Sequence, residues 1–215
     1  HPGRAFGPIL WTQYTLGRGI LKLTAQMPPV GAGDAKEVRL EMRRGGKWAF
    51  AAKAPIDPMS RTATFRIVGH DAREDVPYRA LYPWAGGDAA WEGTIRAEPS
   101  GAPDLAVAAF SCDFGYAFPL RRIVDNIKTQ APDLLFFAGD QIYEPYGGFG
   151  ITRQPTDIAM IDYLRKWYLF GWAWREVLRE RPAVIIPDDH DVFQGNLWGH
   201  GGRPLPPLKP NQREN

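Results

Sequence analysis

Three apolar segments of the chain are each followed by side chains that can bind a metal ion or move a proton. The segments cover residues 105–110, 134–138 and 183–186. The side chains that follow them belong to Cys112, Asp113, Asp140, Tyr143, Glu144, Asp188, Asp189, His190 and Asp191. Carboxylates packed together repel each other, and a cation of charge two or three removes that repulsion. Oxygen ligands beside one thiolate and one imidazole are typical of a transition metal, alone or beside a second metal.

Each of these motifs alone has a plain structural explanation. Gly139-Asp140 is a common strand-to-turn signal, Cys112 fits a small buried apolar side chain, and His190 fits a hydrogen-bonded loop residue. The run 188–191 is harder to explain in this way, because its three carboxylates surround one imidazole. The metal-site prediction therefore rests on the occurrence of such residues after all three apolar segments.

The pattern between the motifs predicts how the chain brings them together. The three apolar segments are typical of parallel strands buried on both faces, and helical spacing follows Pro119 and Thr156. Strand, helix, strand, helix and strand make an α/β unit. The carboxyl ends of its strands lie at one edge of the sheet, where ligands bind in such folds. We therefore expect the ligand residues to converge there.

Residues 1 to about 100 follow a different pattern. Apolar and polar residues alternate at 21–25, 38–42, 63–67 and 78–82, with turn signals between these segments. Alternation predicts strands with one buried face, and several short strands in succession favour a β-sandwich of fibronectin- or immunoglobulin-like type. A Pro-, Gly- and Ser-containing stretch at 98–103 is the expected linker between a sandwich domain, residues 1–100, and an α/β domain, residues 104–215.

The motifs resemble the signature of the PhoD-like alkaline phosphatases, members of the calcineurin-like metallophosphoesterase superfamily. The resemblance lies in Ser111-Cys112, the run 139–144, and the run 188–192 with Asn196. It covers residues 104 to about 203, and the sandwich is similar to the extra domain that such proteins often carry. The implied fold is a metallophosphoesterase-type sheet, and the implied activity is phosphoester hydrolysis by a metal-activated hydroxide.

The resemblance also implies roles for individual residues. Cys112, Asp140, Tyr143, Asp189 and Asn196 would bind a two-metal centre of Fe(III) with Ca(II) or another divalent cation. Asp140 would bridge the metals, and Tyr143 would be a phenolate ligand to Fe(III). Asn196 stands further from the histidine than other PhoD-like sequences place it.

The catalytic residue implied by the resemblance is His190. Its imidazole would hold the phosphate and protonate the departing alkoxide. We expect Asp191 or Asp188 to orient the ring. The residues do not distinguish a phosphomonoester from a phosphodiester substrate.

Length and composition bound the remaining possibilities. The chain has 215 residues, 26 basic and 24 acidic, without a clustered basic run or a transmembrane segment. This charge distribution does not favour nucleic-acid binding.

Superfamily members carry further ligands on later strands, so we expect the α/β sheet to be incomplete here, with a second chain or further residues completing it. A periplasmic or secreted location is implied by the resemblance only. The alternative function is a non-catalytic interaction module with a degenerate or incomplete metal site.

Overall fold

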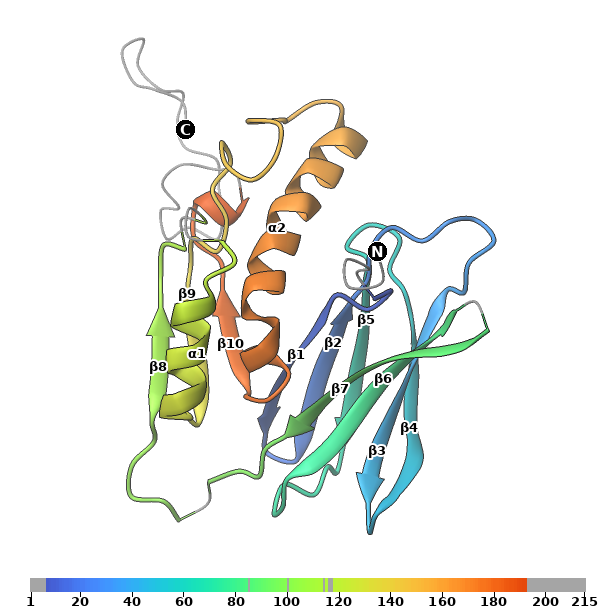
Figure 1. Ribbon diagram of the computed structural model, residues 1–215, viewed down its shortest axis with the longest axis vertical. Coiled ribbons are helices and arrows are strands. Elements are labelled where there is room, and N and C mark those ends of the chain that lie inside the picture. Colours follow the sequence, from blue (N-terminus) through green and yellow to red (C-terminus); the bar gives the residue numbers. More distant parts are fainter. Residues whose placement is uncertain (1–6, 85, 100, 114, 116–117, 193–215) are drawn as a thin grey trace.

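Two antiparallel sheets occupy the amino-terminal part of the computed structural model, which describes residues 7–84, 86–99, 101–113, 115 and 118–192 (Figure 1). One sheet has the strand order β1-β2-β5 and the other the order β4-β3-β6-β7. These strands are β1 (Trp11–Gly17), β2 (Ile20–Gln26), β3 (Glu37–Arg44), β4 (Lys47–Pro55), β5 (Thr62–Val68), β6 (Val76–Trp84) and β7 (Gly87–Ile95).

The alternating segments at 21–25, 38–42, 63–67 and 78–82 lie within β2, β3, β5 and β6, so these four strand predictions are confirmed. Their apolar residues form one buried cluster, against which the partly buried Ile67 packs, because successive side chains of a strand face opposite sides. The strands β1, β4 and β7 were not predicted, because their alternation of apolar and polar residues is weaker.

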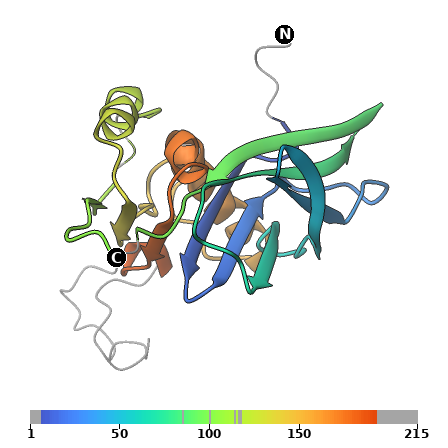
Figure 2. The same ribbon diagram turned by 90° about the horizontal axis from the view of Figure 1, so that it is seen from below.

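The second part of the chain is a parallel sheet of β8 (Val107–Phe110), β9 (Leu134–Ala138) and β10 (Ala183–Ile186), in the order β8-β9-β10. Helix α1 (Arg121–Gln130) connects β8 to β9, and helix α2 (Thr156–Leu178) connects β9 to β10. Both crossovers advance in the same direction along the sheet, and crossovers of one hand then place both helices on the same face. Figure 2 shows α1 and α2 together on one side of these strands.

The other face of the parallel sheet departs from the sequence prediction. We expected three strands buried on both faces, but Val107, Val184 and Ile186 are 50%, 38% and 44% exposed. Val184 and Ile186 alternate along β10 with Ala183, which is buried in the cluster beneath the helices, and with Ile185, which packs against that cluster. Since both helices cover one face, no element among the described residues covers the other. Full burial of these strands was therefore a wrong prediction.

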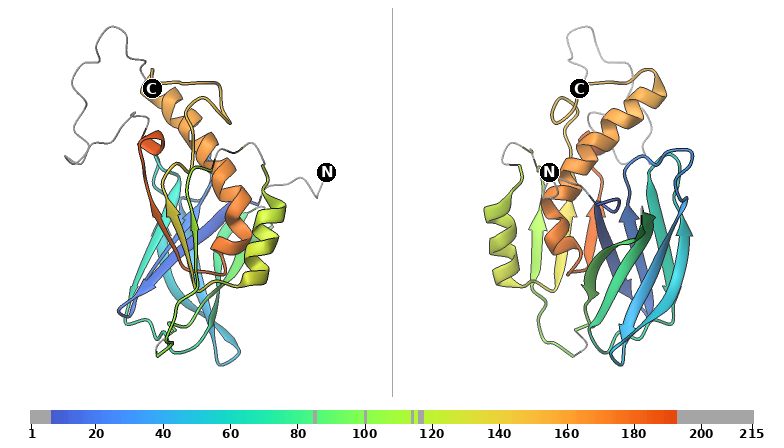
Figure 3. Two further views of the ribbon diagram at one scale, coloured as in Figure 1. Left: turned by 90° about the vertical axis from the view of Figure 1, so that its left-hand side faces the viewer. Right: turned by 45° about the vertical axis from the view of Figure 1, so that its right-hand side comes forward.

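The parallel sheet lies beside β1, and α2 runs along the junction (Figures 1 and 3). Trp11 of β1 is buried in the cluster beneath the helices, and its ring contacts Trp167 and Tyr168. Gly171 lets α2 approach this ring, because a Cβ atom at that position would overlap the Trp11 indole. The buried cluster beneath the helices contains Trp11 from the first part of the chain together with side chains of the second part. The division into two domains near residues 100–104 stays a prediction. Neither described helix is long and apolar enough to cross a membrane.

Substitution of Gly171 by Ala tests this junction. The added methyl group would force Trp11 or α2 to move, and overpacking of this kind lowers the free energy of unfolding by about 1–3 kcal/mol. Gly17→Ala is the matched control, because a Cβ there meets no atom within 4 Å. Urea denaturation followed by tryptophan fluorescence measures both. Equal midpoints for the two variants would show that Gly171 is not a close contact.

Candidate metal centre

The carboxyl ends of β8, β9 and β10 bring the predicted ligands to one edge of the sheet. Beyond the strands the backbones stay paired: the amide of Cys112 donates to the Gly139 carbonyl at 3.2 Å, and that of Asp113 donates to the Asp140 carbonyl at 2.9 Å. After β10 comes the short 3-10 helix His190–Val192, and a ring nitrogen of its first residue lies within 4.8 Å of a carboxylate oxygen of Asp140, which follows β9. The convergence follows from parallel pairing of three short strands.

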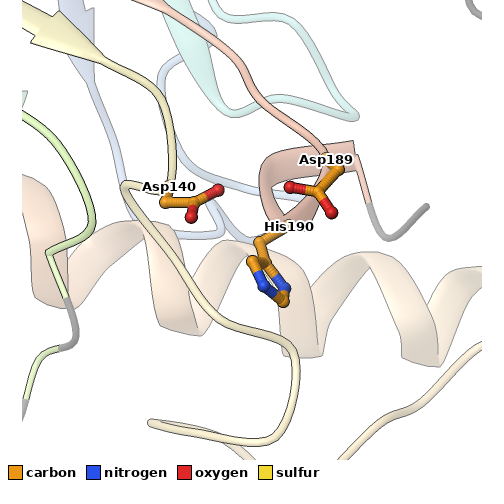
Figure 4. Close-up of side chains that lie close together, drawn as sticks. All are labelled: Asp140, Asp189 and His190. Atoms are coloured by element: carbon orange, nitrogen blue, oxygen red, sulfur yellow. The ribbon is translucent and has the colours of Figure 1, made fainter. Parts of the chain in front are cut away.

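Asp140 is the centre of the cluster. Its carboxylate, in a residue only 8% exposed, accepts hydrogen bonds at Oδ2 from the Tyr143 hydroxyl at 3.0 Å and the Cys112 thiol at 3.6 Å. One ligand atom each from Asp140, Asp189 and His190 lies within 4.8 Å of the other two. Figure 4 shows the carboxylates of Asp140 and Asp189 turned toward each other.

This group of donors fits a cation. Asp140 Oδ1 is buried and has no hydrogen-bond partner among the described residues. A buried carboxylate oxygen without a partner costs free energy unless a positive charge meets it. Asp189 supplies a second negative charge across the same space, and an imidazole and a thiol stand beside it. Oxygen, nitrogen and sulfur donors at this spacing suit a transition metal.

The backbone is strained at two of these residues. Cys112 and Asp140 have φ angles of 59° and 56°, in the left-handed region that side chains other than glycine avoid. Gly139, with φ of 92°, precedes Asp140, and a Cβ on it would overlap the Cβ of Asp188. Strained residues of this kind persist where the surroundings hold them, and they gather at functional sites.

Asp191 ties the ends of β9 and β10 together. Its carboxylate accepts hydrogen bonds from the amides of Asp140, Gln141 and Ile142 at 2.7, 2.8 and 3.1 Å, and from the amide of Asp188 at 2.9 Å. Burial raises the pKa of Asp191, although these four amides act in the opposite direction. The expectation that Asp191 or Asp188 orients His190 is therefore wrong for Asp191, whose oxygens bind backbone instead.

Glu144 takes the place that we expected for those residues. Its Oε2 atom lies 2.6 Å from Nδ1 of His190, and the residue is 2% exposed. Desolvation lowers the pKa of His190, but the hydrogen bond and charge of Glu144 outweigh it, so the pKa lies above its ordinary value. With Nδ1 held, Nε2 is the ring nitrogen that can meet a substrate. From the sequence, Glu144 was expected only as one of the residues that could bind a metal, and its role beside His190 was not predicted.

Tyr143 lies between the histidine and Asp140. Its ring centroid is 4.4 Å from that of His190, and its hydroxyl donates to Asp140. Burial, followed by the hydrogen bonds to Cys112 and Asp140, raises the pKa of the phenol. Of the six predicted site residues, the structure thus brings together Cys112, Asp140, Tyr143, Asp189 and His190. The sixth, Asn196, lies outside the described residues.

Comparison with known proteins bears on the fold alone. No protein-family model matches the chain, and no curated protein matches its sequence. Among solved structures, the purple acid phosphatase PPD1 from yellow lupin (Lupinus luteus) seeds is similar, with 14% identity and a TM-score of 0.58. The match covers 86% of this chain and 36% of that one, so the chain spans about a third of that phosphatase. The fold is therefore similar to that of part of a purple acid phosphatase.

Two weaker structural matches add no argument. The structure of FN3tt mut matches with 10% identity and a TM-score of 0.30, over 40% of this chain and 89% of that one. The twitchin kinase region from C. elegans matches with 16% identity and a TM-score of 0.31, over 50% of this chain and 22% of that one. The PhoD-like assignment stays a prediction.

Asp191→Asn tests the tie between the strand ends. An amide side chain has one acceptor oxygen, and its NH2 group would face amides that must themselves donate. We expect the free energy of unfolding to fall by about 1–3 kcal/mol, the cost of buried donors without partners. Asp188→Asn is the control, since the Asp188 residue is exposed and its carboxylate accepts a hydrogen bond from the amide of its neighbour, Asp189. Equal urea midpoints for the two variants would contradict the assigned role.

Glu144→Gln tests the histidine pair. Because the carboxylate stabilises the protonated imidazole, its removal should lower the pKa of His190. An NMR titration of the imidazole protons measures this pKa in both proteins. Asp157→Asn, an exposed carboxylate in the first turn of α2, is the control that should leave the titration unchanged. An unchanged or higher pKa in Glu144→Gln would exclude the hydrogen-bonded pair as its cause.

Proposed function

We propose that the chain carries part of a metal-dependent phosphoester hydrolase. The observation that carries this proposal is the cluster of Asp140, Asp189 and His190, with ligand atoms within 4.8 Å of each other. Within it, a buried oxygen of Asp140 has no hydrogen-bond partner among the described residues. Similarity of the fold to part of a purple acid phosphatase supports the reaction class.

The finer assignment is a PhoD-like phosphatase or phosphodiesterase. It rests on the motifs at 111–112, 139–144 and 188–192. In this assignment the parallel sheet is part of a metallophosphoesterase domain. The sheets of β1–β7 form a fibronectin- or immunoglobulin-like sandwich before it. The substrate is a phosphoester, and a second chain or further residues supply the rest of the catalytic domain.

The metal ligands in this proposal are Cys112, Asp140, Tyr143 and Asp189, with Asn196 as a further ligand outside the described residues. The metals are Fe(III) and Ca(II) or another divalent cation. Asp140 is suited to bridge them, because Oδ2 faces Cys112 and Tyr143 while Oδ1 is left without a partner among the described residues. When bound, the cations offset charge on the phosphoryl oxygens and acidify the attacking water.

His190 is the proposed catalytic residue. Glu144 holds Nδ1, so the Nε2 proton faces the substrate and can donate to a phosphoryl oxygen or to the leaving alkoxide. A raised pKa keeps the imidazole protonated over a wider pH range, which suits an acid. The ring of Tyr143 lies against the imidazole and limits its rotation.

The deciding variant is Asp140→Asn. The change removes the charge of the proposed bridging ligand while keeping its size, so both bound metal and turnover should be lost. Elemental analysis measures the metal, and hydrolysis of p-nitrophenyl phosphate and its bis-ester measures turnover and distinguishes monoester from diester. Asp104→Asn, an exposed carboxylate before β8, is the control and should retain both.

The two candidate functions give different results in the unaltered protein. Bound metal together with ester turnover supports the hydrolase. A protein that binds no metal and hydrolyses neither ester, also when the missing part of the domain is supplied, is an interaction module. Retention of metal and turnover by Asp140→Asn would reject the proposed centre itself.

A further inference from the structure

A buried ion pair lies on α2 beneath the loop that leaves the candidate metal centre. The ammonium of Lys166 is 2.5 Å from Oδ2 of Asp162, and the two side chains are 1% and 2% exposed. A pair one helical turn apart is ordinarily a surface feature worth little. Burial of both charges costs more free energy than apolar residues of similar size would. A buried pair of this kind, here called the latch pair, needs further contacts that offset this cost.

The latch pair binds the backbone of residues 141–150, which we call the site loop. The amide of Phe149 donates to Asp162 Oδ1 at 2.9 Å, and Lys166 donates to the carbonyl of Gly150 at 2.9 Å. Gly148 lies against the pair so closely that a Cβ would overlap the carboxylate of Asp162. One acceptor and one donor on α2 thus meet one amide and one carbonyl of the loop.

The site loop is therefore fixed at both ends. At its start, Asp191 accepts from the amides of Gln141 and Ile142, and at its end the latch pair binds Phe149 and Gly150. Tyr143 and Glu144 lie between these anchors. A cavity of about 190 Å³, lined by Tyr143, Tyr146, Gly147 and Lys166 among others, lies along the loop, so polar contacts hold this segment where packing is incomplete.

Glu144 depends on that support. It is 2% exposed and binds His190 through Oε2, while Oε1 has no hydrogen-bond partner among the described residues. One hydrogen bond does not hold a buried carboxylate against its desolvation cost, so the backbone that carries it must be fixed. We propose that Asp162 and Lys166 are positioning residues that hold the site loop, and through it Glu144 and Tyr143, against His190 and Asp140.

The catalytic consequence rests on the hydrolase proposed above, whereas the structural consequence does not. The test is the double variant Asp162→Leu/Lys166→Met, in which apolar residues of similar size replace both charges and leave no buried charge unpaired. Such a replacement is often neutral or stabilising for the fold. Glu176→Gln is the control, because it removes an ion pair to Arg179 from the same helix away from the loop.

Three readouts are expected to change in the double variant only. Hydrogen exchange of the Phe149 amide should accelerate by about tenfold or more, the result of losing its acceptor. The ring-current shift that Tyr143 imposes on the imidazole protons of His190 should decrease. In the protein that turns over a phosphoester, kcat should fall about 10- to 100-fold, as expected for misplaced catalytic groups.

A second variant covers the case in which the double variant does not fold. Gly148→Ala leaves both charges in place and displaces the loop from Asp162, with the same expected changes at Phe149 and His190. Wild-type exchange and a wild-type imidazole shift in the folded variants would overturn the proposal. So would a displaced loop with unchanged kcat. If the unaltered protein hydrolyses no phosphoester, the proposed function fails, and the exchange and NMR readouts still decide the role of the latch pair.

Discussion

One carboxylate, that of Asp191, holds the candidate centre together. It accepts four backbone amides, three from the segment after β9 and one from the segment after β10. These segments are about 50 residues apart in the chain, and the parallel pairing of β9 with β10 places them side by side. Hydrogen bonds from amides to a buried charge are among the stronger ones in proteins. The positions of Asp140 on one side and of Asp189 and His190 on the other follow from this contact.

The acidic residues of the centre differ in the groups that their carboxylates contact. Asp191 binds backbone and Glu144 binds the imidazole, so each has a partner inside the protein. Asp140 and Asp189 face each other, and an oxygen of Asp140 has no hydrogen-bond partner among the described residues. The one of these oxygens left without a hydrogen-bond partner among the described residues, Oδ1 of Asp140, therefore belongs to the group whose ligand atoms lie within 4.8 Å of each other. This distribution of contacts is the one expected of the proposed metal centre.

Much of this arrangement could be predicted from the sequence, because the carboxyl ends of parallel strands must share an edge. That rule suffices to place Cys112, Asp140 and Asp189 together. It does not decide whether Glu144 or Asp191 binds His190, because the answer depends on the path of the site loop, which the sequence does not give. The exposed face of the parallel sheet was missed because apolar composition does not show that both helices lie on one side. Asp162 and Lys166 were missed because their spacing is that of an ordinary surface pair.

The burial of Trp11 affects how the protein unfolds. The indole is part of the first strand of the sandwich, yet its neighbours are side chains of α2, and it has almost no exposed surface. Separation of the sandwich from α2 and the parallel sheet would expose both this ring and the surface of α2 around Gly171. Neither part can then loosen without loss of apolar contacts in the other, so heating should melt them as one cooperative unit. A protease that attacks only unfolded chain would release no stable sandwich fragment.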